Sequence, residues 1–323
     1  MNLSINDKGQ FRILHVTDIQ ERADFSPLTR AAMEYLLDTQ KPDLVMLGGD
    51  NCFGPDMRTR EDVSVFLEKL AAPMEERGIK WAHIFGNHDH DVCCVLPYEL
   101  QAMYEAFPHC VSRHSQGIHG ITNYYLDVTD ENNHILFRIW CMDTNGSLAD
   151  SALNERFGPG GLQENMILPK MPGGNNRFDM LYFDQLAWYD AESRKLELQE
   201  KRKVPGIMFC HVAPEEFTLA MENPEQCGLV GSAVERLAPA AMNSGLFSLL
   251  VQRGDVHVVA CGHTHMNSFS AHYCGIQMCF SACTGYTCYG RQDIRGGRIF
   301  DFDRGNGSFT TDMVVTTDVI PME

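Results

Sequence analysis

Short apolar runs, each followed by polar residues, recur through the first third of the chain. The runs Phe11–Thr17, Leu44–Leu47 and Trp81–Phe85 have the length and composition of buried strands. Apolar residues at helical spacing lie between them, over 28–36 and 63–70. Ser26 and Pro27 mark the start of the first of these two helices. Alternating strands and helices predict a parallel sheet, with the polar residues that follow each strand gathered along one edge.

The second half of the chain contains more hairpin signals. The later expected elements are strands at Tyr124–Val128, Ile135–Met142, Gly206–Cys210 and Val256–Ala260, hairpin turns at 130–133, near Cys274 and at 304–307, a glycine- and proline-rich loop at Phe157–Arg177, and a long helix from near Asp184. The chain shows no repeat, low-complexity tract or linker, so residues 1–323 are expected to form one domain.

Composition places the chain among ordinary globular proteins. Hydrophobic residues make up 44% and charged residues 21% of the sequence. No stretch approaches the roughly 18 apolar residues that span a bilayer, so no membrane partner is expected. The polar segment 1–10 leads straight into a strand and does not resemble a signal peptide. A cytoplasmic location is therefore expected.

The net charge and the cysteines narrow the possible partners. At a formal charge of −17, the chain lacks the basic surface that a nucleic-acid polymer needs, although metal ions would still let it bind a small phosphorylated substrate. The 12 cysteines are scattered without an export signal, which favours reduced thiols. Paired zinc spacings are absent, so a cysteine metal site is not expected.

Polar residues that close the apolar strands form the candidate chemical site. They are Asp18, Gln20, Asp50, Asn87, His88, His211, His263 and His265. A mixture of carboxylate, amide and imidazole ligands suits Mn, Fe or Zn better than Ca. One bridging carboxylate would place two metals roughly 3.5–4 Å apart, as in two-metal hydrolases.

Each of these residues has a structural alternative when it is taken alone. An aspartate such as Asp18 after a strand is commonly a turn or helix cap. His211 alone would more often be a hydrogen-bonded core histidine. The two histidines His263 and His265, one residue apart at a strand end, are a stronger signal. The ordered set carries the prediction.

That ordered set resembles the five motifs of the calcineurin-like metallophosphoesterases. The motifs are Asp18-x-Gln20, Gly49-Asp50-Asn51, Gly86-Asn87-His88-Asp89, His211 and Gly262-His263-Thr264-His265. The runs 243–247 and 284–286 resemble the purple-acid-phosphatase-related branch. The resemblance covers about residues 11–302 and implies an α/β fold, a sandwich of two mixed β-sheets flanked by α-helices in four αββα layers.

The resemblance also implies a role for each motif residue. Asp50 would bridge two divalent or trivalent transition-metal ions. Asp18 and His265, with Gln20, would hold the first ion, and Asn87, His211 and His263 would hold the second. His88 would face the ester, stabilise charge or protonate the leaving oxygen, while a metal-bridging hydroxide attacks phosphorus. Two divalent ions bring +4 against about −2 from the two ligand carboxylates, so the site would stay positive.

The chain departs from the family pattern at two positions. The first motif usually ends in histidine, and here it ends in Gln20. Many relatives carry an aspartate three residues after the second-motif aspartate, where it orients the catalytic histidine; here that residue is Phe53. Asp89, which we group with His88 as a catalytic candidate, or Asp91 can take its place.

The predicted activity is dinuclear-metal-dependent hydrolysis of a phosphomonoester or phosphodiester. The substrate would be a phosphorylated small molecule or a phosphoprotein. His90 and Arg291 are candidate phosphate contacts, against the alternative that they are exposed polar residues, and the segment 215–235 is either a rim over the site or an inert excursion. Two alternatives remain: a nucleotide or cyclic-nucleotide phosphodiesterase, and a non-catalytic scaffold with the same fold. Oligomeric state is not predicted.

Overall fold

Two mixed β-sheets form the centre of the computed structural model, which describes residues 3–148 and 178–320. The larger sheet contains, in spatial order, β1 (Leu3–Ser4), β5 (Tyr124–Thr129), β6 (Ile135–Met142), β7 (Gly206–Cys210), β9 (Val256–Cys261), β11 (Ile276–Phe280), β10 (Ser268–Tyr273) and β8 (Val230–Ser232). The smaller sheet contains β13 (Ser308–Val315), β12 (Gly296–Asp303), β2 (Gln10–Val16), β3 (Leu44–Gly48) and β4 (Lys80–Ile84).

Each sheet combines a run of parallel strands with antiparallel pairs. Strands β2, β3 and β4 run parallel in the smaller sheet, and β6, β7, β9 and β11 run parallel in the larger one. Hairpins β10–β11 and β12–β13 extend the two sheets at their edges. Parallel neighbours end at the same edge of a sheet, so the loops after β2, β3 and β4 lie together, as do those after β7 and β9.

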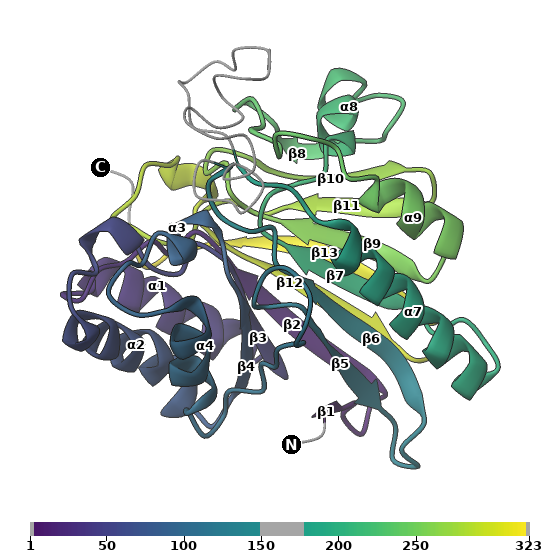
Figure 1. Ribbon diagram of the computed structural model, residues 1–323, viewed down its shortest axis with the longest axis horizontal. Helices are drawn as coiled ribbons and strands as arrows, with labels where there is room; N and C mark the ends of the chain where they lie inside the picture. The colour runs from purple at the N-terminus through teal and green to yellow at the C-terminus, as the bar shows by residue number, and fades with distance from the viewer. Residues whose placement is uncertain (1–2, 149–177, 321–323) are drawn as a thin grey trace.

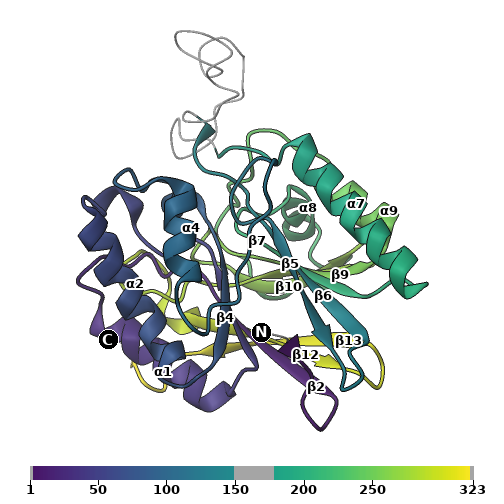
Figure 2. The same ribbon diagram turned by 60° about the horizontal axis from the view of Figure 1, so that its bottom comes forward.

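Helices cover the outer face of each sheet. Against the smaller sheet lie α1 (Pro27–Gln40), α2 (Arg60–Glu75) and α4 (Pro97–Glu105); against the larger sheet lie α7 (Phe183–Glu200), α8 (Glu216–Glu222) and α9 (Leu246–Arg253). The short helix α3 (Asn87–His90) follows β4. Figures 1 and 2 show α1, α2 and α4 on one side of the two sheets and α7 and α9 on the other. The four-layer αββα sandwich is confirmed.

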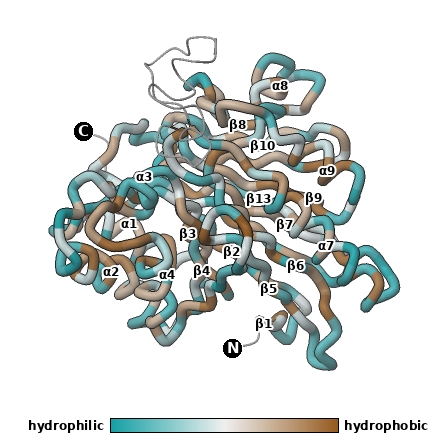
Figure 3. Tube along the Cα trace, viewed as in Figure 1, coloured by the Kyte–Doolittle hydropathy of each residue, from teal (hydrophilic) through white to brown (hydrophobic). Residues whose placement is uncertain are grey.

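Strand periodicity explains how one strand serves two layers. On β2, Leu14 and Val16 pack toward the helices, whereas Phe11 and Ile13 pack between the sheets. Successive side chains of a strand point to opposite faces, so a strand buried on both faces must be apolar throughout. Figure 3 shows hydrophobic segments along the central strands and hydrophilic ones at outer turns such as the one between β5 and β6.

Most predicted elements are found close to their expected bounds. The Ser26 hydroxyl caps α1 by accepting a hydrogen bond from the Leu28 amide at 3.2 Å, as the sequence signal predicts. Both late hairpins and the helix near Asp184 are confirmed. The helices α4, α8 and α9 were not predicted, and α8 and β8 lie within the segment 215–235.

Two further predictions are not tested by the described residues. The predicted loop Phe157–Arg177 lies outside the described residues. The prediction that 1–323 form one domain stays a prediction. Within 3–148 and 178–320, no helix combines the length and the apolar character needed to cross a bilayer.

Candidate metal centre

The eight predicted strand-end residues come from both sheets and meet at one place. Asp18 and Gln20 follow β2, Asp50 follows β3, and Asn87 and His88 follow β4 in the smaller sheet; His211 follows β7, and His263 and His265 follow β9 in the larger sheet. Packing of the two sheets brings together the edges at which their parallel strands end. Residues that are more than 200 positions apart in the sequence, such as Asp18 and His265, therefore come within ion-pair distance.

The loops that carry these residues adopt unusual backbone conformations. Positive φ angles occur at Asp18 (52°), Gln20 (44°), Asp50 (48°) and His263 (82°). Such conformations are uncommon outside glycine and cluster at functional sites. Two motif glycines are required by close packing: a Cβ on Gly86 would lie 2.3 Å from an Asp50 oxygen, and one on Gly262 would lie 2.5 Å from an Asp18 oxygen.

The first group of ligands surrounds the Asp18 carboxylate. The Nε2 atom of His265 lies 3.3 Å from Asp18 Oδ1. His265 Nδ1 lies 2.8 Å from the carbonyl oxygen of Tyr289, which orients the ring so that Nε2 faces the centre. The Gln20 amide lies 3.1 Å from Asp50 Oδ2 and 3.4 Å from His265 Nε2. Gln20 is therefore inside the centre, beside Asp50 and His265.

The second group of ligands lies on the other side of Asp50. Asp50, His211 and His263 each place a possible ligand atom within 4.8 Å of the other two. The Nδ1 atom of His211 lies 2.9 Å from the Gly48 carbonyl oxygen, which leaves Nε2 facing Asp50 Oδ2 at 3.2 Å. Within this group, the buried atoms Asn87 Oδ1 and His263 Nδ1 make no hydrogen bond, and the approach of His211 Nε2 to Asp50 lacks hydrogen-bond geometry. Unsatisfied buried polar atoms are costly, and these three are suitable metal ligands.

The electrostatics of the centre require positive charge. Burial alone would raise the pKa of Asp18 and Asp50, but the neighbouring imidazoles hold both pKa values below the ordinary range. Burial alone would lower the pKa of His211 and His265, yet the carboxylates raise these values to about 10 and about 9. Burial, together with the charge of His211, lowers the pKa of His263 to about 3. Two buried carboxylates so close together need cations, which protons or metal ions can supply.

The His88 side chain contacts a carboxylate, that of Asp91, although Phe53 stands where many relatives carry an aspartate. The His88 backbone amide donates to Asp50 Oδ1 at 2.7 Å, and the His88 Nδ1 lies 2.8 Å from Asp91 Oδ2. The Phe53 ring packs against the imidazole, with ring centroids 5.1 Å apart. Asp91 therefore holds the imidazole at Nδ1, and the Phe53 ring packs beside it.

Asp89 lies behind the centre, where it organises the loops. Its carboxylate accepts hydrogen bonds from the backbone amides of Gly86, Asn51 and Cys52 at 2.8–3.3 Å. Burial and the nearby charge of Asp50 raise the pKa of Asp89 to about 6. The described contacts give Asp89 a structural role, and its grouping with His88 as a catalytic candidate stays a prediction.

The two candidate phosphate contacts lie in different surroundings. His90 Nε2 lies 2.8 Å from the buried Asp143, and His90 lines a cavity together with Asp91. Arg291 instead pairs with Asp293 and donates to the Ser232 hydroxyl. The structure therefore places His90, not Arg291, in a cavity beside the partner of His88, while both phosphate roles stay predictions.

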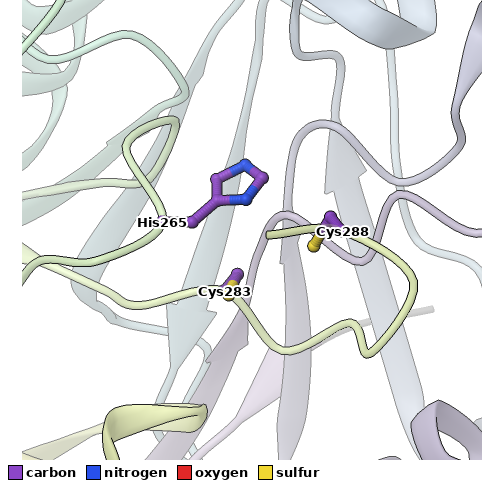
Figure 4. A group of neighbouring side chains, drawn as sticks. All are labelled: His265, Cys283 and Cys288. Atoms are coloured by element: carbon purple, nitrogen blue, oxygen red, sulfur yellow. The ribbon is translucent and has the colours of Figure 1, made fainter. Parts of the chain in front are cut away.

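Sequence reasoning missed two thiols beside the centre. Cys283, Cys288 and one nitrogen of His265 all lie within 4.8 Å of one another, and Figure 4 shows both thiols near the ring. Four residues separate Cys283 from Cys288, a spacing that paired zinc ligands also show, so the expectation that such spacings are absent is wrong. The available signal was their position on either side of the run 284–286, which carries part of the family resemblance.

Sequence relatives share most of the chain. "Probable inactive purple acid phosphatase 14" of Arabidopsis thaliana is 28% identical over 318 residues, covering 90% of this chain and 74% of that protein. "Probable inactive purple acid phosphatase 29" of the same plant is 27% identical and covers 90% of this chain and 75% of its own length. "Phosphatase DCR2" of Saccharomyces cerevisiae is 26% identical over 83% of this chain and 46% of its own.

A solved structure and a family model complete the comparison. The crystal structure of a dimetal phosphatase from Danio rerio superposes with a TM-score of 0.59 at 16% identity, covering 94% of this chain and 98% of that one, which shows a shared fold. The family model "Calcineurin-like phosphoesterase" matches residues 11–267, a span that includes all eight strand-end residues. The chain therefore belongs to the calcineurin-like phosphoesterase family, in its purple-acid-phosphatase-related branch.

Proposed function

We propose that this protein hydrolyses phosphate esters with two transition-metal ions held at the centre between its sheets. The observation that carries the proposal is the set of buried atoms on Asn87, His211 and His263 that make no hydrogen bond, with a nitrogen of each histidine within 4.8 Å of an Asp50 oxygen. A merely structural cluster would satisfy these atoms with hydrogen bonds. The donor set, with imidazole, amide and carboxylate atoms, suits Mn, Fe or Zn.

The residues divide into two ligand groups that share Asp50. The first ion would be held by Asp18, Gln20 and His265, and the second by the three residues whose buried atoms make no hydrogen bond. Such ions act as Lewis acids and lower the pKa of bound water from 15.7 toward about 7. The His211 and His265 rings are held at Nδ1 by backbone carbonyls, so the chain fixes their Nε2 atoms toward the ions.

His88 would act on the ester without binding metal. Its Nδ1 is engaged by Asp91, so the other ring nitrogen is free to donate a proton to the leaving oxygen or to stabilise charge on phosphate. A carboxylate paired with the remote nitrogen fixes the ring and its tautomer, as in other histidine acids and bases. His90 lines the cavity next to this pair and is our candidate contact to the substrate.

The substrate is proposed to be a phosphorylated small molecule or a phosphoprotein. A net charge of −17 supports a compact phosphate group over a nucleic-acid polymer, because bound metal ions would supply concentrated positive charge at the centre. All 12 cysteines are free thiols, which supports our proposal of a reducing compartment such as the cytoplasm.

Replacement of His88 tests the proposed chemistry. The chain, reconstituted separately with Mn, Fe and Zn, would be assayed on aryl phosphomonoesters and aryl phosphodiesters. We expect His88→Ala to keep its metal content and to lose turnover by a factor on the order of 10²–10⁴, with a smaller loss on esters whose leaving groups are acidic. His134→Ala, on the exposed turn between β5 and β6, is the matched control and should behave as the parent.

A non-catalytic metal-binding protein is the second candidate, and the names of two Arabidopsis thaliana relatives favour it. Their names describe those plant proteins as probably inactive; the present chain retains His88 and its Asp91 partner. Two bound metals with no turnover on any phosphate ester, and the same result for His88→Ala, would support this candidate over hydrolysis. Fewer than one metal per chain after reconstitution would contradict both.

A further inference from the structure

We propose that Cys283 and Cys288 are a dithiol that oxidises reversibly to a disulfide and thereby alters the first metal-binding group. The proposal concerns the loop from 283 to 289, which follows β11 and turns beside Asp18 and His265. The dithiol chemistry does not depend on the proposed hydrolytic function, because it requires only the two thiols.

The two sulfur atoms are close and lie in a confined setting. They lie within 4.8 Å of each other, and only four residues separate the cysteines. Cys283 is buried, whereas Cys288 is half-buried and so within reach of a small reagent. A Cβ on Gly290 would lie 2.5 Å from the Cys283 sulfur, so the chain turns back tightly over this thiol. Disulfide formation requires the two sulfurs to approach to about 2.05 Å.

A buried cation lies next to both thiols. The Arg295 guanidinium is 3.1 Å from the Cys283 sulfur and 3.9 Å from the Cys288 sulfur. It also donates to the carbonyl oxygen of Cys288 at 2.7 Å, which holds the loop in place. The guanidinium lies nearer Cys283 and favours the thiolate of that residue, and the thiolate is the form that reacts in disulfide exchange. The same positive charge disfavours a metal cation between the two sulfurs.

The loop between the cysteines supports the first ligand group directly. The Cys288 thiol lies 3.5 Å from the carbonyl oxygen of Asp18, and the Thr287 hydroxyl donates to the carbonyl oxygen of Gln20 at 2.9 Å. The Tyr289 carbonyl oxygen accepts from His265 Nδ1, and its ring stacks on the imidazole at 4.1 Å. Drawing the two sulfurs together would remove the thiol contact with Asp18 and shift the residue that orients His265.

Glutathione disulfide, a small disulfide oxidant, suffices for the reaction. The Cys288 thiol gives up its proton to water, and its sulfur attacks one sulfur of the oxidant, which forms a mixed disulfide and releases one glutathione thiolate. The Cys283 thiolate then attacks the Cys288 sulfur, which breaks the mixed disulfide and releases the second glutathione thiolate. Two electrons pass from the protein to the oxidant, and the two protons leave on the two glutathione thiols.

A second close pair provides an internal comparison. The sulfurs of Cys210 and Cys261 are 3.5 Å apart on the neighbouring strands β7 and β9. Both are buried within the apolar cluster between the larger sheet and its helices. Proximity is thus shared by the two pairs, whereas exposure of one member and a neighbouring guanidinium are specific to Cys283 and Cys288.

Mass spectrometry after redox equilibration tests the proposal. The native full chain would be incubated in glutathione buffers of increasing disulfide content, quenched in acid, alkylated and fragmented. We expect a link between Cys283 and Cys288 that lacks two hydrogen atoms, while Cys210 and Cys261 are recovered as alkylated thiols. Recovery of Cys283 and Cys288 as thiols, when the exposed Cys93 is modified, would overturn the proposal.

Single variants separate the two steps of the exchange. Cys283→Ser should accumulate the mixed disulfide with glutathione at Cys288, because no second thiol resolves it. In Cys288→Ser, the buried Cys283 should stay unmodified. This variant still tests the proposal if Cys283→Ser fails to fold. A cobalt complex with thiolate absorption that either variant abolishes would make the cluster a metal site and overturn the proposal.

The effect on the first metal group has its own measurement. Binding of Mn alone would be titrated by calorimetry into the reduced and oxidised forms. We expect oxidation to weaken Mn binding at the first site about 10- to 100-fold, the range for loss of a residue that orients a metal ligand. Cys288→Ser should bind Mn equally well under reducing and oxidising conditions. Equal binding by both forms would overturn the coupling. If the protein hydrolyses no phosphate ester, the mass-spectrometric result for the disulfide is unaffected. Failure of the hydrolytic proposal is therefore distinguishable from failure of the dithiol proposal.

Discussion

At the scale of single residues, Gln20 is one of two positions where this chain departs from the motif pattern of its family. The amide nitrogen is placed 3.1 Å from Asp50 Oδ2 and 3.4 Å from His265 Nε2. An amide can be rotated so that its oxygen takes the place of its nitrogen, and the oxygen is the atom that would bind a metal. Its neutral carbonyl is a poorer ligand for Zn or Fe than imidazole.

Replacement of Gln20 should therefore change the first site selectively. We expect Gln20→His to tighten binding of the first metal by roughly tenfold, about 1.4 kcal/mol, and Gln20→Ala to weaken it. Titration of each variant with Mn, Fe or Zn measures both sites. If the two variants bind the first metal as the parent does, Gln20 packs in the loop and is not a ligand.

Asp91 is expected to act through His88. Asp91→Asn retains the size of the side chain but weakens the contact of 2.8 Å that orients the imidazole. We expect turnover to fall by less than in His88→Ala, with metal content unchanged and a smaller loss for acidic leaving groups. Glu105→Gln is the matched control, because Glu105 pairs with Nδ1 of the exposed His114 at 3.0 Å in the same way. Equal turnover in Asp91→Asn and the parent would contradict the role.

The residue scale also shows what the sequence could predict about the site. The strand-end residues were identifiable because parallel strands end at a common edge, whatever the loops do. Asp91 could be narrowed only to a choice between itself and Asp89, since that choice depends on how a single helical turn directs its side chains. The pairing of Cys283 with Cys288 depends on the path of a loop, and no periodicity encodes it.

At the scale of elements, long strands with apolar runs were predicted well, and short helices were not. The bounds predicted for β6 and β7 match the structure. The helix α8 has seven residues and α9 has eight, lengths at which helices are not stable alone. Phe217 of α8 and Leu250 of α9 are buried against the larger sheet, so tertiary packing stabilises these helices. Local sequence carries little of that information.

Buried His83 links β4 to α4 and makes stability depend on pH. The imidazole is 2.9 Å from the Gln101 side-chain oxygen and 2.7 Å from the Ser112 hydroxyl, and burial lowers its pKa to about 3. In the unfolded chain the ring takes up a proton as the pH falls through about 6.5, whereas the folded protein stays neutral. The unfolded state then binds more protons, so stability decreases below pH 6.5.

Replacement of His83 should remove this part of the pH dependence. Between pH 7.5 and pH 5.5, we expect the parent to lose about 1.4 kcal/mol more unfolding free energy than His83→Gln, which keeps a polar side chain without the titration. Urea unfolding at both pH values measures the difference. His134→Gln, at an exposed turn, should follow the parent. A parent and a His83→Gln variant with the same pH slope would contradict the assignment.

At the scale of the whole molecule, the metal centre joins the two sheets. Asp18, Asp50 and Asn87 follow strands of the smaller sheet, and His211 and His263 follow strands of the larger one. The apolar layer between the sheets is continuous without the centre and packs residues such as Phe137 and Phe209. Hydrophobic burial therefore sets the sandwich, and the polar edge is brought together as its consequence.

Metal binding should for this reason stabilise the whole fold and not one loop. A ligand present at 100 times its Kd stabilises a folded protein by about 2.7 kcal/mol, and the unfolded chain cannot present ligands from two sheets at once. We expect Mn to raise the Tm of the parent and a chelator to reverse the shift. Asp50→Asn should lose most of the response because Asp50 is shared by both ligand groups, whereas the exposed control Asp184→Asn should keep it. A Tm of the parent that does not respond to Mn, Fe or Zn would contradict a centre that bridges the sheets, since binding to folded protein alone must raise it.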